Sequence, residues 1–159
     1  MDYVSWAQKE WDWLQQSGLI NAEHLVDDGL TTTCQNNGQQ TWTYNQGVIV
    51  GGLAELSRAT KNGSYTAAAQ QIADATLDKL TTNKEGGEGI GILHEGCEPN
   101  CTRDESQFKG VFARNLRLLY EQSGEQRYSD FLEANANSVW ENDRSESGGE
   151  VLLGQSWTG

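Results

Sequence analysis

The fold class of this chain is decided by a run of residues with helical periodicity, Tyr44-Asn45-Gln46-Gly47-Val48-Ile49-Val50-Gly51-Gly52-Leu53-Ala54-Glu55-Leu56. Its apolar residues recur at three- and four-residue steps, which place them on one face of a helix over about 44–61. Asn62-Gly63 ends this helix, and the same periodicity continues over 64–80, with Ser64 as the expected N-cap. Two helices joined by so short a turn form a helical hairpin.

Three further segments have helical periodicity. Residues 2–17 form the first, which Gly18 stops, and residues 128–139 belong to the last. The middle one carries its apolar residues between 108 and 119, and Asp104 followed by Gln107 is close to a capping box at its start. Short extended segments are expected only at 90–93 and 150–153, so the sequence predicts an all-α fold.

The helical pattern repeats along the chain. Each of two hairpins carries a tyrosine at the start of its second helix and a Gly-Gly-Glu triplet after it. The tyrosines are 63 positions apart and the triplets 62, namely Tyr65 and Tyr128, and Gly86-Gly87-Glu88 and Gly148-Gly149-Glu150. Repeated hairpins stack because one alone cannot bury its apolar face. Residues 1–159 thus hold about two and a half hairpins of one domain, and we expect them to be part of a longer stack.

Composition excludes several classes of function. The chain has 11 Lys+Arg against 23 Asp+Glu, a formal net charge of -12, which opposes binding to nucleic acid or an anionic membrane. No run approaches the roughly 20 apolar residues of a membrane span. The N-terminus lacks the basic start and apolar stretch of a signal peptide.

The cysteines and two sequons bear on the compartment. Cys97 and Cys101 bracket a short loop in which a local disulfide is one alternative. The sequence disfavours the other alternative, a metal site, because zinc needs four convergent ligands and only His94 lies close by. Cys34 is left over, either free and buried or paired outside this chain. Asn62-Gly63-Ser64 and Asn100-Cys101-Thr102 fit the glycosylation sequon and favour an extracellular protein.

Residues 34–47 form the densest cluster of amide and aromatic side chains. Aromatic faces stack on sugar rings, and amides both donate to and accept from hydroxyl groups, so the cluster suits a carbohydrate. The alternative is an amide-rich loop with Trp42 inserted in the core.

Other polar residues give weaker signals. Asp104 is a helix cap or a site residue, Lys109 pairs with an acid or extends to solvent, and Gly110 implies close backbone approach. Asp27-Asp28 before a glycine is typical of a solvated turn. His24 and His94 are isolated from other ligands, no Gly-x-Ser-x-Gly is present, and the glycine-rich residues 86–91 suit a loop rather than a phosphate site.

Three ordered blocks resemble glycoside hydrolase family 76, the endo-α-1,6-mannanases and fungal cell-wall transglycosidases. They are Asp27-Asp28-Gly29-Leu30 with Cys34, Trp42-Thr43-Tyr44-Asn45-Gln46-Gly47 with the helix after it, and Gln107-Phe108-Lys109-Gly110-Val111-Phe112. Residues 97–101 are similar to fungal members in particular. The resemblance implies an (α/α)6 toroid of six hairpins, about twice this length, of which residues 1–159 are the C-terminal half.

The resemblance also implies a chemistry. Two carboxylates would cleave an α-1,6-mannosidic bond with retention, without a cofactor or metal. In the family these are a tandem Asp pair on an early helix, which we expect upstream of Met1. By the same resemblance, Asp27-Asp28 aligns with the turn before Cys34 and not with the catalytic pair. The residues expected to line the mannose subsites are Trp42, Tyr44, Asn45, Gln46 and Asp104.

The resemblance places the protein outside the cell, secreted or anchored at the wall or membrane, with α-1,6-mannan and the missing half-domain as partners. The chain alone is expected to be inactive and marginally stable. Two alternatives remain: a non-catalytic mannan-binding or wall-interaction module, and a hairpin scaffold for protein contacts.

Overall fold

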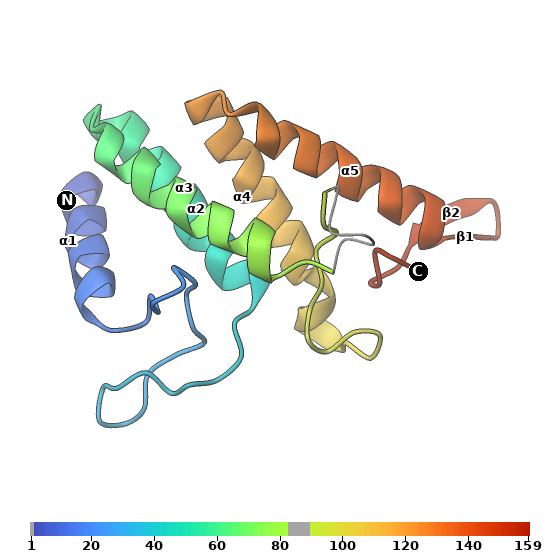
Figure 1. The fold of residues 1–159 in the computed structure, drawn as a ribbon, viewed down its shortest axis with the longest axis horizontal. Helices are drawn as coiled ribbons and strands as arrows, with labels where there is room; N and C mark the ends of the chain where they lie inside the picture. The colour runs from blue at the N-terminus through green and yellow to red at the C-terminus, as the bar shows by residue number, and fades with distance from the viewer. Residues whose placement is uncertain (1, 83–89) are drawn as a thin grey trace.

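The computed structural model describes residues 2–82 and 90–159. This part of the chain contains five α-helices, one 3-10 helix and one small antiparallel sheet (Figure 1). The elements are α1 (Tyr3–Gln16), α2 (Thr43–Thr60), α3 (Gly63–Lys79), η2 (Arg103–Gln107), α4 (Phe108–Ser123), α5 (Gln126–Asn142), β1 (Arg144–Ser147) and β2 (Glu150–Leu153). The prediction of helical hairpins is confirmed, with α2–α3 and α4–α5 as the two full hairpins and α1 as the extra helix.

The two hairpins pack through their first helices. α2 contacts α3, α4 and α1, and α4 also packs against α5, so α2 and α4 lie at the centre (Figure 1). The core between them is apolar and closed to solvent, and its largest side chains include Phe112, Leu116, Leu119 and Tyr128. α1 lies at one end of this row of helices and the β1–β2 sheet at the other.

Glycines let α2 approach α4 closely. A Cβ on Gly47 would lie 2.6 Å from the Cα of Phe112, and one on Gly51 would lie 1.9 Å from the Asn115 side chain. The prediction that Gly110 marks a close approach is wrong, because a Cβ there meets no atom of the described residues within 4 Å. The close approach of α2 to α4 therefore depends on Gly47 and Gly51 of α2.

Two predicted helix caps differ from the observed ones. The N-cap of α3 is Asn62, whose side chain accepts a hydrogen bond from the Ser64 N–H at 3.0 Å, and not Ser64 itself. Before α4, Thr102 is the N-cap of η2, and the Glu105 carboxylate accepts from its N–H at 2.8 Å. Asp104 is therefore no cap, because a short 3-10 helix precedes α4 and moves the start of the helical region back.

Each hairpin is followed by chain that folds back in antiparallel fashion. The predicted extended segment at 150–153 is confirmed as β2, and its partner β1 was missed. Gly148 and Gly149 turn between them with φ of 61° and 85°, which suits a two-residue hairpin turn. After the first hairpin, Leu93 forms only an isolated bridge with Thr81, so 90–93 is no strand. The Gly86-Gly87-Glu88 triplet lies outside the described residues.

The long connection between α1 and α2 is ordered by its own polar side chains. Asp27 accepts hydrogen bonds from the amides of Asn21 at 2.9 Å and Asn36 at 2.6 Å. Cys34 is free and exposed, with φ of 58°, so the expectation of a buried thiol is wrong. The carboxylate of Asp27 thus organises the loop rather than facing solvent, although Asp28 beside it is exposed.

An apolar groove of about 380 Å³ opens between α1 and α2. Its lining includes Trp11, Trp13, Val48 and Leu53, of which Trp13 is 52% and Val48 48% exposed. So much apolar surface on adjacent helices is typical of a face that packs against further protein. None of the helices among residues 2–82 and 90–159 combines the length and apolar character needed to cross a bilayer.

The close approach of α2 and α4 predicts how their glycines respond to substitution. Gly47→Ala forces its methyl group into the Phe112 backbone and should lower the free energy of unfolding by about 2 kcal/mol. Gly52→Ala, on the same helix but with nothing within 4 Å, should raise it by about 0.5 kcal/mol through helix propensity. Urea unfolding of both variants tests this, and equal effects would contradict the proposed close contact.

Candidate functional site

Three aromatic rings gather where α2 and α4 begin. The ring of Phe108, the first residue of α4, lies 4.3 Å from that of Tyr44 and 5.4 Å from that of Trp42. The Trp42 pair is edge-to-face at 71°, and the Tyr44 pair is tilted at 41°. Such geometries are favourable for aromatic quadrupoles. The close helix crossing brings the two helix starts, and hence these rings, together.

These rings line a pocket whose rim is polar. The pocket measures about 320 Å³ and is lined by Asp28, Trp42, Tyr44, Thr102, Arg103, Asp104, Glu105 and Phe108. Three carboxylates thus stand beside the aromatic rings, with Arg103 as the one cation among the lining residues. Burial and the nearby charge of Asp28 raise the pKa of Tyr44, so its hydroxyl is neutral and able to donate and accept at neutral pH.

The structure divides the five residues predicted to bind sugar. Trp42, Tyr44 and Asp104 line the pocket. Gln46 has no exposed surface, and its amide accepts from the Val26 N–H and donates to the Val26 carbonyl, both at 2.7 Å. Gln46 therefore joins the preceding loop to α2 and is not available to a ligand. Asn45 does not line this pocket, and its Nδ2 is buried with no hydrogen-bond partner in the described part of the chain.

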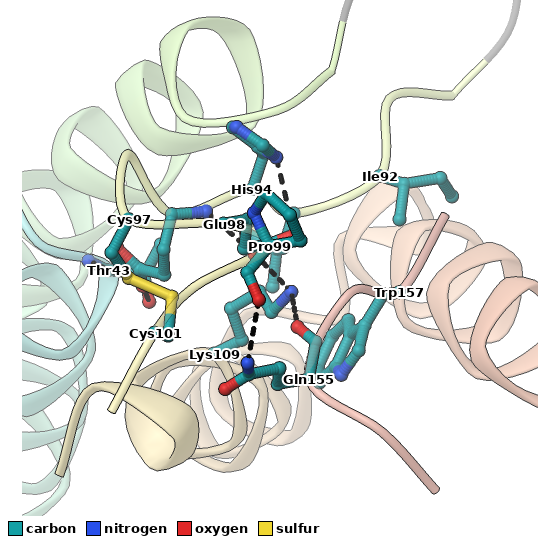
Figure 2. Close-up of polar contacts among 12 residues, drawn as sticks. Thr43, Ile92, His94, Cys97, Glu98, Pro99, Cys101, Lys109, Gln155 and Trp157 are labelled. Atoms are coloured by element: carbon teal, nitrogen blue, oxygen red, sulfur yellow. Dashed lines mark hydrogen bonds and ion pairs between the residues drawn. A yellow bond between two sulfur atoms is a disulfide. The ribbon is translucent and has the colours of Figure 1, made fainter. Parts of the chain in front are cut away.

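A buried ion pair lies next to the pocket wall. Lys109, which follows Phe108, pairs with Glu98, and each side chain is only 4% exposed. Figure 2 shows the Lys109 ammonium between Glu98 and Gln155, whose carbonyl accepts from it at 2.6 Å, with the Trp157 ring alongside. Burial lowers the pKa of Lys109, while the neighbouring carboxylates oppose that shift. Of the two predictions for Lys109, pairing with an acid is the one confirmed.

Glu95 extends this network to α2. Its carboxyl group is 1% exposed and accepts hydrogen bonds from the hydroxyl and, at 3.2 Å, the N–H of Thr43. Burial raises the pKa of Glu95 to about 7, and Glu98 adds to the rise. The bonds from Thr43 and the charge of Lys109 act in the opposite direction. Glu95 is thus a buried acid poised near neutral pH.

Both acids belong to one loop, residues 93–101. Its end is closed by the Cys97–Cys101 disulfide, which confirms that of the alternatives for these cysteines (Figure 2). Glu95 and Glu98 are also joined directly, because the Glu95 N–H donates to the Glu98 carboxylate at 2.9 Å. His94 Nδ1 lies 3.3 Å from the other oxygen of Glu98. Within residues 2–82 and 90–159, no group of three or more metal-ligating side chains is placed to hold an ion.

Sequence reasoning missed Glu95, Glu98 and the ring of Phe108 as parts of this region. Phe108 carries a signal, since it begins the Phe-Lys-Gly block next to a predicted helix start. Glu98 lies between two cysteines and Lys109 needs an acid, which together point to the pair. Glu95 carries no signal in the sequence, because its partner Thr43 is 52 residues away.

The buried position of Glu95 predicts a pH-dependent stability. Its pKa is higher in the folded chain than in the unfolded one, so its contribution is full below about pH 4.5 and is lost as pH rises through about 7. Glu95→Gln keeps a neutral acceptor for Thr43. It should come within about 1 kcal/mol of the wild type at pH 5 and exceed it at pH 8 by about 3 kcal/mol.

Urea unfolding at pH 5, 6, 7 and 8 measures this difference. Glu121→Gln on the surface of α4, where the side chain is 52% exposed, is the matched control and should leave the wild-type pH profile unchanged. Parallel pH profiles for wild type and Glu95→Gln would contradict the raised pKa of Glu95 as the cause of the pH dependence.

Comparison with known proteins places this chain in a family. The model of glycosyl hydrolase family 76 matches residues 1–159. Mannan endo-1,6-alpha-mannosidase DCW1 of Candida albicans is 30% identical over 169 residues, which cover 98% of this chain and 35% of the relative. DFG5 of the same organism, also a mannan endo-1,6-alpha-mannosidase, is 30% identical with the same coverage. The chain thus spans about a third of the length of these relatives.

Solved structures agree with the sequence comparison. Lin0763 from Listeria innocua superposes with a TM-score of 0.79 at 30% identity, covering 98% of this chain and 42% of that protein. An inactive alpha-1,6-mannanase variant of Salegentibacter sp. HEL1_6, in complex with alpha-1,6-mannotetrose, superposes with a TM-score of 0.77 at 25% identity, covering 98% and 44%. Two adjacent aspartates are replaced by alanine in that variant. With a family model matched along its full length, the chain belongs to glycosyl hydrolase family 76.

Proposed function

We propose that this chain supplies the sugar-binding wall of an endo-α-1,6-mannosidase. The observation that carries the proposal is the pocket in which Trp42, Tyr44 and Phe108 stand beside Asp28 and Asp104. Aromatic rings offer apolar faces to pyranose rings, and carboxylates accept hydrogen bonds from sugar hydroxyls. A family 76 relative that binds alpha-1,6-mannotetrose supports mannose as the sugar.

The catalytic carboxylates are proposed to lie outside residues 1–159. Asp27-Asp28 is the only Asp-Asp pair in the sequence, and Asp27 is held by the Asn21 and Asn36 amides in a loop. This arrangement suits a structural carboxylate better than a nucleophile or an acid. The adjacent aspartates changed in the inactive Salegentibacter variant support a tandem pair, which the remaining two thirds of the relatives' length would contain.

The rest of the domain is the proposed protein partner. The apolar groove between α1 and α2 has the lining expected of a face covered by further helices.

The disulfide Cys97–Cys101 and the exposed sequon residues Asn62 and Asn100 support a secreted or cell-surface protein, since disulfides persist in oxidising compartments. Hydrolysis and transglycosylation share the same first step, so both fit the proposal.

Sugar binding by the pocket predicts a residue-specific loss of affinity. Tyr44→Ala removes a ring that lines the pocket, and it should weaken binding of α-1,6-mannotetraose by about tenfold or more, equivalent to about 1.4 kcal/mol. Trp140→Ala, at an exposed tryptophan on α5 outside the pocket, is the matched control and should bind as the wild type does. Titration calorimetry measures both. Equal affinity in wild type and Tyr44→Ala would refute the proposal that this pocket binds the sugar.

The catalytic part of the proposal is tested in a chimera. Residues 1–159 replace the matching region of Candida albicans DCW1, and the chimera is expected to release oligosaccharides from α-1,6-mannan. The 159-residue chain alone, and the chimera with a tandem Asp pair from DCW1 changed to Asn, should release none. A folded chimera that leaves α-1,6-mannan intact would refute the proposal that the chain is part of an endo-α-1,6-mannosidase. If the chain alone still binds the sugar, the alternative of a non-catalytic binding module stands in its place.

A further inference from the structure

We propose that Glu95 is a positioning residue for the sugar-binding pocket: its buried carboxyl group fixes the first residue of α2 and thereby holds Trp42 and Tyr44 beside Phe108. The inference rests on the proposed function for the identity of the ligand. The positioning itself is argued from contacts within the described residues.

α2 begins without a cap of its own. Trp42 is the N-cap residue, with φ of -100° and ψ of 145°, and its side chain makes no capping hydrogen bond. The first N–H groups of a helix need acceptors, and the helix dipole favours a carboxylate there. Glu95 supplies that acceptor from 52 residues away, to both the N–H and the hydroxyl of Thr43. Thr43 lies between Trp42 and Tyr44 in the sequence, so the contact acts directly on both ring-bearing residues.

Phe108 is fixed to the same loop from the other side. It precedes Lys109, whose ammonium pairs with Glu98, and Glu98 accepts from the Glu95 N–H. The loop is further anchored to α5, because the Leu93 N–H donates to Asn135 at 2.8 Å. The starts of α2 and α4 are thus set relative to each other through one short segment, residues 93–101.

The surroundings of Glu95 make its geometry demanding. The groups that face it are Thr43 from α2, Lys109 from α4 and Glu98 from its own loop. All four residues have buried polar atoms, and a buried carboxyl group without its partners is strongly destabilised. A side chain in this position has few alternative arrangements. It therefore defines where α2 starts, and the pocket wall depends on that start.

The test measures the pocket wall directly and through its ligand. The indole N–H resonance of Trp42, assigned with Trp42→Phe, reports the position of that ring without any ligand present. Titration calorimetry with α-1,6-mannotetraose reports the assembled pocket. Glu95→Ala removes the acceptor, and Glu95→Gln keeps it. Tyr128→Phe is a control that loses a hydrogen bond to Asp74, and neither of these two residues lines the pocket. All measurements are made well below the unfolding temperature of each variant.

Glu95→Ala is expected to shift the Trp42 resonance and to weaken mannotetraose binding by about tenfold. Glu95→Gln should bind within about twofold of wild type, and its Trp42 resonance should stay constant from pH 5 to 9, whereas that of wild type moves with a midpoint near 7. Tyr128→Phe should be less stable with an unchanged resonance and affinity.

Two results would overturn the positioning role: an unchanged Trp42 resonance in Glu95→Ala, or equal losses of affinity in Glu95→Ala and Tyr128→Phe. If no protein binds the sugar but only Glu95→Ala shifts the resonance, the positioning role holds and the proposed sugar ligand is wrong.

Discussion

The start of α2 depends on a single buried carboxyl group that comes from another part of the chain. Helices usually begin with a side chain that accepts their first N–H groups locally. Here Glu95 performs that task across 52 residues, and it does so in a position that is 1% exposed. The arrangement ties a loop, two helix starts and an aromatic cluster into one unit, because each part supplies a polar group that another part needs.

The unit also requires that α2 and α4 lie close together. Gly47 and Gly51 remove the side chains that would hold the helices apart, and Phe112 and Asn115 occupy the space. The apolar core between the two helices fixes their packing, while the Glu98–Lys109 pair lies at the start of α4. Removing one partner of such a buried pair would leave an uncompensated charge, which is strongly destabilising. Packing therefore sets the distance between the helices, and polar contacts set where they start.

Most of the fold was predictable and less of the site was. Helical periodicity located all five helices, since an amphipathic pattern depends only on neighbouring residues. The predicted caps, Ser64 and Asp104, differ from the observed caps, Asn62 and Thr102, because capping depends on the backbone geometry at single residues. Gln46 was predicted to bind the ligand because it lies among amide and aromatic residues in the sequence, yet it is buried and hydrogen-bonded to Val26. Long-range partners such as Glu95 leave no periodic trace in the sequence.

Asn62 combines two roles through different atoms of its amide group. Its Oδ1 caps α3, whereas N-glycosylation attaches to Nδ2, so a glycan and the helix cap are compatible. The residue lies in the turn between α2 and α3, after the last residue of α2, whereas the pocket residues Trp42 and Tyr44 lie at the start of α2. Eighteen helical residues at 1.5 Å each separate the two ends by about 27 Å. A sugar attached to the protein there would project away from the one that the pocket is proposed to bind.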